Sequence, residues 1–189
     1  MTSTGRQYFA KMYSGSEDPW NFATSSYEQR KYELTMSMLP RSRYRSAFEP
    51  GCSIGVLSEL LARRCDRLLI GDFIPSVLEQ ARERLAPYKN VAAKFLTIPE
   101  DWPEQDFDLV VLSEILYYFD ISTLDEILDR LIETTEPGAH VMAVHWRGET
   151  DYPLSADRAH AFINGRAELQ KIAHHAEDEF VMDLWERAQ

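Results

Sequence analysis

The sequence predicts an α/β fold with a mostly parallel sheet and helices on both of its faces. Segments with strand character and segments with helical periodicity alternate five times along the 189 residues. One strand segment, residues 107–114 (FDLVVLSE), is an almost continuous apolar run, which is typical of a strand buried on both faces. The last two segments, 168–175 (ELQKIAHH) and 179–186 (EFVMDLWE), alternate and predict a closing antiparallel hairpin. Alternation of this kind indicates a parallel sheet whose crossover helices cover both faces.

The N-terminal part of the chain precedes the first strand. Residues 1–25 are polar with scattered aromatic side chains, and we expect a helix followed by a loop there. The apolar residues of 27–39 (YEQRKYELTMSML) recur at helical spacing, which predicts a second helix. Ser25 or Ser26 could cap that helix.

The remaining strands and helices follow in alternating order. Apolar segments predict strands at 45–51, 67–72, 91–96, 107–114 and 140–146. Helical periodicity predicts helices at 56–64, 75–85, 122–135 and 155–163. Pro75 opens the second of these helices. Ser122 and Asp125 form a capping box at the start of the third, and we expect Pro137-Gly138 to end it.

Length and composition exclude several classes of protein. A chain of 189 residues with 44% hydrophobic residues favours one domain with a sizeable core. No apolar window of about eighteen residues predicts a membrane helix and no apolar signal core opens the chain, so we expect a cytoplasmic protein. Cys52 and Cys65 form no CxxC pattern, which indicates two thiols in a reducing compartment. The net charge of −11 disfavours nucleic acid and anionic membranes and would attract a cationic partner, although it could serve solubility alone.

The loop after the first predicted strand is the first candidate for a site, because ligands of such sheets bind beyond the carboxyl ends of the strands. Its sequence is Glu49-Pro50-Gly51-Cys52-Ser53-Ile54-Gly55. A dinucleotide fingerprint would need glycine at 51, 53 and 56, and only Gly51 fits, so we expect no NAD site. Small residues here would let the backbone approach the amino-acid part of a ligand, while the helix start offers N–H groups. An ordinary tight turn is the alternative.

Asp72 ends the second predicted strand, 21 positions after Gly51. A carboxylate at about this distance binds ribose hydroxyls in such folds, because its two oxygens suit a vicinal diol. The alternative is a helix cap before Pro75. The carboxylate therefore strengthens the prediction of a cofactor site at this edge of the sheet.

Three stretches carry a resemblance to a known family: DPWNFATSSYEQRKY (18–32), FEPGCSIGVLSELLA (48–62) and SEILYYF (113–119). They closely resemble the NodS family of methyltransferases, bacterial enzymes that N-methylate the free amine of a de-N-acetylated chitooligosaccharide. The glycine loop resembles the first motif, E-x-G-x-G-x-G, of S-adenosylmethionine-dependent methyltransferases, with Ser53 in place of the middle glycine. The resemblance runs from about Tyr8 to Gly138. Residues 144–160 (VHWRGETDYPLSADRAH) differ from the nodulation enzymes, so the acceptor could belong to another sugar or natural-product pathway.

The resemblance implies a Rossmann-like class I methyltransferase fold, with a mostly parallel seven-stranded sheet, helices on both faces and a C-terminal antiparallel hairpin. Residues 1–189 would be a single methyltransferase domain, with an N-terminal helical lid segment at 1–40 and the Rossmann-like core at 41–189. The implied cofactor is S-adenosyl-L-methionine, with S-adenosyl-L-homocysteine as product. The residues expected to bind it are Trp20, Arg30, Glu49, Gly51, Cys52, Ser53, Gly55, Asp72, Phe73, Thr97, Ile98 and Ser113.

The family likeness implies that Trp20 and its neighbours form a lid over the cofactor. An aromatic face attracts a sulfonium cation, and a lid excludes water. Trp20 and Phe22 could instead staple the N-terminal helix to the sheet. Arg30 could pair with the carboxylate of the cofactor or stay solvated, and Ile98 would contact the adenine.

Methyl transfer to an amine needs a deprotonated nitrogen, and an α-amino group with a pKa of about 7.7–8.0 is largely charged at neutral pH. His145, at the end of a predicted strand, is the first candidate for the base, because histidine titrates in the useful range. It could instead be a satisfied histidine at a sheet edge. Glu114, just after residues 107–113, is the second catalytic candidate and could hold the amine or the ammonium group of the cofactor.

Aromatic residues near the same strand ends suit a sugar ring. The side chains expected to bind the acceptor are Tyr117, Tyr118, Trp146 and Arg147, with Asp151 and Tyr152 as further walls. The two neighbouring tyrosines could equally serve helix packing. His160 could turn inward from its helix, although a surface position is favoured. Residues 174–179 (HHAEDE) resemble a metal site in composition, but we expect a solvated turn and no metal.

The favoured function is therefore an S-adenosylmethionine-dependent methyltransferase that N-methylates an amino sugar or (chito)oligosaccharide. A methyltransferase for a hydroxyl or for an amine of another small natural product is the first alternative. A non-catalytic cofactor-binding module is the second, and Asp72 together with the small-residue loop argues against it. The expected partner is a small-molecule acceptor, with neither nucleic acid nor membrane; no oligomeric state is predicted.

Overall fold

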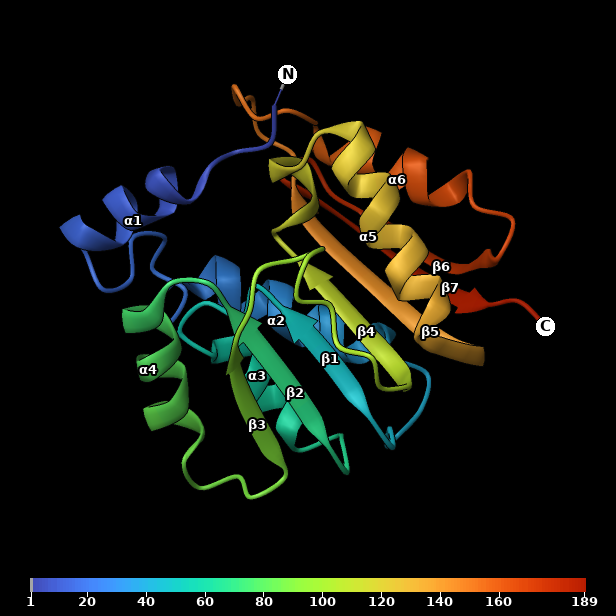
Figure 1. Ribbon diagram of the computed structural model, residues 1–189, viewed down its shortest axis with the longest axis horizontal. Helices are drawn as coiled ribbons and strands as arrows, with labels where there is room; N and C mark the ends of the chain where they lie inside the picture. Colours follow the sequence, from blue (N-terminus) through green and yellow to red (C-terminus); the bar gives the residue numbers. More distant parts are fainter. Residues whose placement is uncertain (1) are drawn as a thin grey trace. The chain divides into compact units, whose positions relative to one another are not determined.

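The computed structural model describes residues 2–189, which form two compact units (Figure 1). One unit comprises residues 5–97, and the other comprises residues 98–189 together with 2–4. The described residues carry six α-helices, one 3-10 turn and seven strands. None of these helices is long and apolar enough to cross a membrane.

The unit of residues 5–97 is built on a three-stranded parallel sheet. Its strands, in the order β3-β2-β1, are β1 (Ala47–Pro50), β2 (Leu68–Asp72) and β3 (Val91–Phe95). Its helices are α1 (Arg6–Gly15), α2 (Ser26–Met38), α3 (Val56–Ala62) and α4 (Pro75–Leu85). Every residue of β1 and β2 is buried, as expected of parallel strands that are covered on both faces. The sheet thereby brings the ends of β1 and β2, and the loops that follow them, to one edge.

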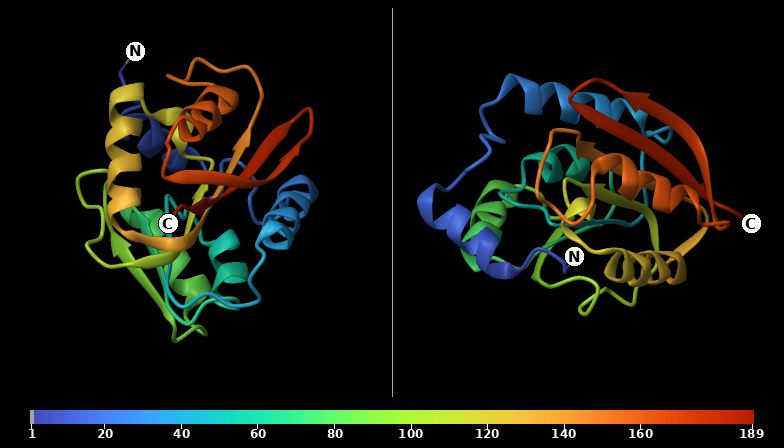
Figure 2. Two further views of the ribbon diagram at one scale, coloured as in Figure 1. Left: turned by 90° about the vertical axis from the view of Figure 1, so that its right-hand side faces the viewer. Right: turned by 90° about the horizontal axis from the view of Figure 1, so that it is seen from above.

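The unit of residues 98–189 is built on a mixed sheet. Its strands, in the order β4-β5-β7-β6, are β4 (Phe107–Ser113), β5 (Thr135–Trp146), β7 (Phe180–Arg187) and β6 (Leu169–Ala176). Its helical elements are η1 (Leu116–Tyr118), α5 (Ile121–Glu133) and α6 (Ala156–Asn164). β4 and β5 are parallel, whereas β7 is antiparallel to both of its neighbours. Figure 2 shows β6 and β7 in red as the long closing hairpin.

These elements confirm the predicted class: an α/β chain, mostly parallel, that closes with an antiparallel pair. The bounds of α4 agree with the predicted helix at both ends. Ser25, one of the two proposed caps, accepts the backbone N–H of Glu28 at 3.4 Å and starts α2. Cys52 and Cys65 are buried and remain thiols.

The predicted ends of α5 are wrong. Asp120 is its N-cap, because its carboxylate accepts the backbone N–H of Thr123 at 3.0 Å, so Ser122 lies inside the first turn. At the other end, the Thr134 hydroxyl donates back to the carbonyl of Arg130 at 2.7 Å. The helix ends at Glu133, and Pro137-Gly138 belong to the start of β5, where the pairing register with β4 shifts.

Candidate functional site

The loop between β1 and α3 has an unusual backbone. Gly51, Ser53 and Gly55 take positive φ angles of 71°, 49° and 78°. Glycine adopts this region without steric cost, whereas serine is strained there. A side chain at Gly55 would also lie 3.2 Å from the backbone of Ala81 in α4. The small residues that the sequence places here are therefore required by the path of the chain, and Ser53 is its strained member.

Asp72 holds this loop from the end of β2. Its Oδ2 accepts the backbone N–H of Ser53 at 3.2 Å, and its Oδ1 accepts that of Ile74 at 2.9 Å. Burial raises the pKa of the carboxyl to about 6, although the N–H groups directed at it favour the charged form. Each carboxylate oxygen has about two acceptor positions, so capacity remains for ligand hydroxyls. Asp72 thus steadies the loop and the entry to α4 at the same time.

The DPWNF motif forms a tight turn ahead of α2. Asp18 accepts the backbone N–H groups of Phe22 and Ala23 at 2.8 and 2.9 Å. Asn21 takes a positive φ of 58°, a conformation that asparagine tolerates better than most residues. The turn stacks the rings of Trp20 and Phe22 with their centroids 5.6 Å apart. Asp18 and Asn21 therefore serve to present the two aromatic rings together.

Tyr13 of α1 joins these rings to the glycine loop. Its ring packs edge-on against Trp20, with centroids 5.3 Å apart, and its hydroxyl lies 2.7 Å from the Ser53 hydroxyl. Burial raises the pKa of Tyr13 well above its usual value, and the Ser53 contact offsets this only in part, so the phenol stays neutral. Within residues 5–97, the aromatic segment thus lies directly on the loop.

Phe22 and Trp20 differ in what they contact. Phe22 packs against the buried cluster of Ile54, Ile74 and Val77, as the stapling alternative expects. Trp20 is half-buried and stacks on Phe22 at the side of the loop. The segment therefore has one anchoring ring and one ring suited to cover a ligand.

Glu49 lies under the loop at the end of β1. Its side chain is buried, and its Oε2 accepts the hydroxyl of Ser58 in α3. Burial raises the pKa of Glu49 to about 8, against the smaller effect of Ser58, so the carboxyl is largely protonated at neutral pH. Burial also raises the thiol pKa of Cys52, and the nearby Asp72 and Glu49 add to the rise. Both residues support the loop from inside, and their contact with a cofactor stays a prediction.

We expect the buried Glu49 carboxyl to make the stability of the protein depend on pH. The folded protein keeps this proton up to about pH 8, whereas an unfolded glutamate loses it near its usual pKa of 4.5. The contribution is therefore complete below about pH 4.5 and is lost as the pH rises through about 8. Relative to Glu49→Gln, the wild type should lose up to about 1.4 kcal/mol of unfolding free energy per pH unit in this window. Urea unfolding of both proteins across the window measures the difference, and parallel pH profiles would show that Glu49 ionises normally.

The other residues predicted for the cofactor fall in both units. Arg30 and Thr97 are exposed and Phe73 is half-buried, all within residues 5–97. Ile98 and Ser113 belong to the other unit, the first before β4 and the second at its end. Their roles stay predictions.

Glu114 directly follows β4 and has a strained backbone, with a φ of 57°. Its N–H donates to the carbonyl of Val144 at 2.8 Å. Its Oε2 accepts the backbone N–H of Trp146 at 3.0 Å and the hydroxyl of Tyr117. A strained residue that is held from several sides is common where a side chain must be positioned for function. Glu114 is half-buried, so its carboxylate is within reach of a ligand.

Three tyrosines, which we call the tyrosine trio, pack together beside Glu114. Tyr117 stacks on Tyr152 with centroids 5.2 Å apart, and Tyr118 packs edge-on against both at 4.7 and 4.6 Å. Burial is the main cause that raises the pKa of Tyr117 and of Tyr118, and Glu114 raises both further, so both phenols stay neutral. The trio forms a compact aromatic cluster with polar hydroxyls, and its contact with an acceptor stays a prediction.

His145 lies in β5 between β4 and β7, so the alternative of a satisfied histidine at a sheet edge is wrong in its position, although both ring nitrogens do have partners. It is completely buried. Its Nε2 accepts the backbone N–H of Leu116 at 3.0 Å, and its Nδ1 lies 2.9 Å from Nε2 of His160. A base that removes a substrate proton needs a lone pair that reaches the substrate. The geometry therefore favours Glu114 over His145 as the group that meets an amine.

Trp146 ends β5, and Arg147 follows it as the first residue that lines an open pocket of about 580 Å³, formed by residues 147–152, 154 and 155. Trp146 is 40% exposed, and a side chain on Gly148 would collide with its indole at 1.9 Å. Glycine at 148 thus lets the indole lie flat on the backbone. The guanidinium of Arg147 donates to the Glu177 carbonyl at 2.9 Å and to Asp157 at 3.1 Å. Arg147 is therefore already engaged with its own chain, whereas Trp146 offers an open face.

One prediction about a histidine is wrong: His160, for which a surface position was favoured, is buried and faces His145 and Asp183. His174 and His175 are solvent-accessible as predicted, but they lie at the end of β6 and not in the turn itself. They bond to Asp183 and Glu177, respectively.

Comparisons with known proteins show which family the chain is similar to. The sequence profile of the family described as Nodulation protein S (NodS) matches residues 4–145. Nodulation protein S of Bradyrhizobium diazoefficiens is 32% identical over 123 residues, which are 64% of this chain and 59% of that protein. The matched region thus spans less than two thirds of that relative's length.

Two solved structures extend the likeness. A candidate methyltransferase from Pseudomonas syringae is 39% identical, over 86% of this chain and 100% of that one, with a TM-score of 0.78. The N-methyltransferase NodS from Bradyrhizobium japonicum WM9, solved in complex with S-adenosyl-L-homocysteine, is 19% identical over 97% of this chain and 98% of that one, with a TM-score of 0.87. The Rossmann-like methyltransferase fold predicted from the sequence is confirmed.

Proposed function

The chain belongs to the family of nodulation protein S, and from this membership we propose that it is an S-adenosylmethionine-dependent methyltransferase whose acceptor is an amine. The observation that carries the proposal is the strained small-residue loop that Asp72 holds at the end of β2. When bound, the cofactor supplies a methyl group on a sulfonium cation. The protein's own residues must bind the cofactor, orient the amine and exclude water. They must also accept the proton that the ammonium loses before its nitrogen can attack.

The residues of 5–97 fit such a cofactor. The backbone between Gly51 and Gly55 would hold its amino-acid part, because the loop brings main chain and no large side chain to the start of α3. Asp72 would accept the ribose hydroxyls with its remaining acceptor positions. Trp20, stacked on Phe22 and touching Tyr13, would act as the lid, since an aromatic face attracts a sulfonium and limits the access of water.

Glu114 is the residue that we assign to the amine. Its carboxylate accepts the backbone N–H of Trp146 and the Tyr117 hydroxyl, and these two bonds hold it in place after β4. A carboxylate orients an ammonium by charge-assisted hydrogen bonds and can take up a proton as the nitrogen becomes a nucleophile. Holding the nitrogen in line is itself a large part of the catalysis of such a transfer. The net charge of −11 favours the approach of a cationic amine.

We further propose that the amine belongs to an amino sugar. Support comes from the tyrosine trio beside Glu114 and from Trp146, whose indole lies open on Gly148. Flat aromatic faces with nearby hydroxyls combine apolar area with hydrogen-bonding capacity, which suits the face of a sugar ring. Residues 144–160 differ from the nodulation enzymes, so the amino sugar need not be a chitooligosaccharide.

Methyl transfer from S-adenosylmethionine to a panel of acceptors tests both levels of this proposal. The panel holds amino sugars, de-N-acetylated chitooligosaccharides, their N-acetylated forms, neutral sugars and small non-sugar amines. We expect turnover only with free amines, and the fastest turnover with those on a sugar. Turnover confined to N-acetylated or neutral sugars would rule out the amine, and equal rates for non-sugar amines would remove the sugar. Cofactor binding without turnover on the whole panel would favour a non-catalytic module.

A further inference from the structure

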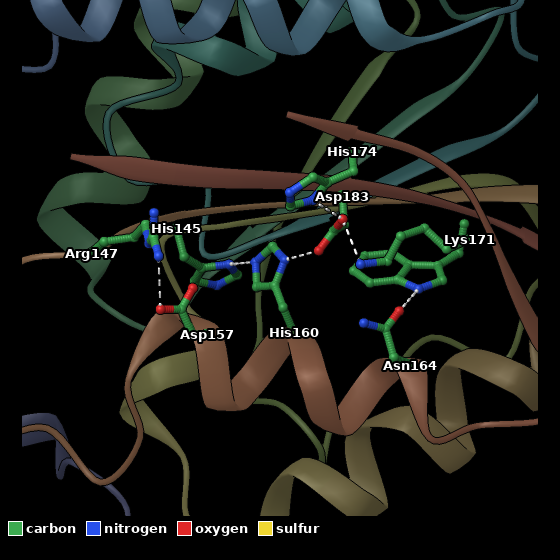
Figure 3. Close-up of polar contacts among 9 residues, drawn as sticks. His145, Arg147, Asp157, His160, Asn164, Lys171, His174 and Asp183 are labelled. Atoms are coloured by element: carbon green, nitrogen blue, oxygen red, sulfur yellow. Dashed lines mark hydrogen bonds and ion pairs between the residues drawn. The ribbon is translucent and has the colours of Figure 1, made fainter. Parts of the chain in front are cut away.

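A buried chain of hydrogen bonds runs from the acceptor side to the closing hairpin (Figure 3). His145 Nδ1 lies 2.9 Å from His160 Nε2, and His160 Nδ1 lies 2.7 Å from Asp183 Oδ2. These three side chains are at most 3% exposed. The other carboxylate oxygen of Asp183 lies 2.7 Å from both Lys171 Nζ and His174 Nδ1, which are partly exposed on β6. We call His145, His160 and Asp183 the relay.

The direction of the bonds fixes the tautomer of each ring. A backbone N–H can only donate, so His145 Nε2 accepts from Leu116 and the ring proton of His145 is on Nδ1. That Nδ1–H donates to His160 Nε2, which places the ring proton of His160 on Nδ1, facing Asp183. Every group in the relay therefore donates to the next one, from Leu116 to the carboxylate.

The charges around the relay maintain this state. Burial would raise the pKa of Asp183, but the bonds from His160, Lys171 and His174 outweigh it and lower the pKa below its usual value. The Lys171 ammonium balances the buried carboxylate from the hairpin side. The relay also meets two aromatic rings: Tyr117, whose hydroxyl bonds to Glu114, packs against His145, and Trp185, which lies under the Lys171 ammonium, packs against His160.

We propose that the relay is a positioning device for the proposed methyl transfer: it holds the acceptor loop, residues 114–118, as long as His145 Nε2 can accept the N–H of Leu116. His160 and Asp183 are then positioning residues that act through His145. Leu116 begins η1 and lies two residues after the strained Glu114. The Leu116 bond is thus one of the contacts that keep the Glu114 carboxylate in place. What the loop does for an acceptor rests on the proposed function, whereas its attachment to the relay does not.

A single proton added to the relay should release this bond. Of the two rings, His160 is the one that lies against the Asp183 carboxylate, which would balance a positive charge on it. His160 would take the Nδ1 proton of His145 onto its Nε2, and His145 would gain a solvent proton on its own Nε2. The total is one added proton, and His145 Nε2–H then faces Leu116 N–H, donor against donor. The acceptor loop would lose its support, so methyl transfer should fail at low pH although His145 itself is completely buried.

Lys171→Gln tests this coupling from a partly exposed position that is remote in the sequence from the loop. Loss of the cation beside Asp183 should make the relay easier to protonate. We expect the ring nitrogen signals of His145 and His160 and the backbone amide of Leu116 to titrate with one midpoint in NMR spectra of the protein alone. In Lys171→Gln this midpoint should rise by about 0.5–1 pH unit.

Two variants serve as controls. Lys171→Arg keeps the charge and should restore the wild-type midpoint. Lys89→Gln changes an exposed lysine with the same loss of charge and is the matched control. His174 also contacts Asp183, so its own ring nitrogen signals are recorded separately from those of His145 and His160.

The kinetic arm uses the amine that the acceptor panel identifies. We expect the acidic limb of kcat to move with the NMR midpoint in Lys171→Gln and to stay in place in Lys89→Gln. A Leu116 amide that does not titrate with the two rings, or an acidic limb that is the same in Lys171→Gln, would overturn the proposal. If the NMR midpoints move together while no amine is methylated, the proposed function fails and the relay stands. If an amine is methylated but the His145, His160 and Leu116 signals do not share one midpoint, the relay proposal fails and the proposed function stands.

Discussion

Replacing Asp72 with alanine is expected to weaken the binding of S-adenosyl-L-homocysteine by about 1–3 kcal/mol, which is roughly 5- to 150-fold in Kd. Two losses contribute. The variant lacks the acceptor that we assign to the ribose hydroxyls, and it also releases the backbone of Ser53, which Asp72 holds at 3.2 Å. Isothermal titration calorimetry measures the change directly. An unchanged affinity in a folded Asp72→Ala protein would contradict the assignment of Asp72.

Asp72→Asn and a matched control separate these two losses. Asparagine keeps the size of the side chain and one carbonyl oxygen, so it should lose less affinity than alanine. Asp66→Asn removes an exposed carboxylate that pairs with Arg43 in the same unit, and should leave binding unchanged. Because burial raises the pKa of Asp72 to about 6, the wild-type affinity should fall as the pH drops through that value and the carboxyl is protonated. Asp72→Asn should show no such fall, and a fall of the same size in that variant would assign it to another group.

The fold could be predicted from the sequence because most of its signals are local. The almost continuous apolar run at 107–113 became β4, buried at five of its seven residues, and the proline at the start of α4 marked its first turn. The ends of α5 could not be predicted as reliably, because two acids and several hydroxyls compete to cap it. Asp120 accepts the N–H of Thr123, and the choice between it and Ser122 depends on the path of the preceding chain.

The shape of the loop after β1 could also be predicted in part. Gly51, Gly55 and Asp72 carry local requirements, namely positive φ angles and an acid at a strand end, so their residue types are informative. Tyr13 carries no such signal. Its hydroxyl meets Ser53 only because α1 folds back over a loop 40 residues further along, and an aromatic residue in a polar helix does not indicate its partner.

The relay could not be predicted for the same reason, since its members come from β5, α6 and β7. One signal was present in the sequence: Asp183 is a charged residue in the otherwise apolar stretch FVMDLW, and a buried carboxylate requires partners. His160 is one of the partners that the buried Asp183 carboxylate requires. The predicted base, His145, was a sound choice by residue type, but periodicity does not reveal that Leu116 and His160 occupy both of its nitrogens.

Glu114→Gln is expected to lower kcat for methyl transfer to an amine by about 10²–10⁴-fold, the usual contribution of a positioned acid–base group. Glutamine keeps the volume of the side chain and an oxygen for the N–H of Trp146, so the strained turn after β4 should persist. What it loses is the negative charge that orients the ammonium and accepts its proton. Single-turnover kinetics with the best acceptor of the panel measure the chemical step without product release.

Two controls show whether the carboxylate itself is responsible. Glu149→Gln removes an exposed acid from the neighbouring pocket and makes the same change in net charge, so it should leave kcat within about twofold. Tyr117→Phe removes the hydroxyl that Glu114 accepts, and should lower kcat less than Glu114→Gln because the charge remains. In all three variants the affinity for S-adenosyl-L-homocysteine should stay near the wild-type value, since none of the three residues is among those that we expect to bind the cofactor. A full rate in Glu114→Gln would show that the amine loses its proton elsewhere, and a loss of cofactor affinity in this variant would reassign Glu114 to the ammonium group of the cofactor.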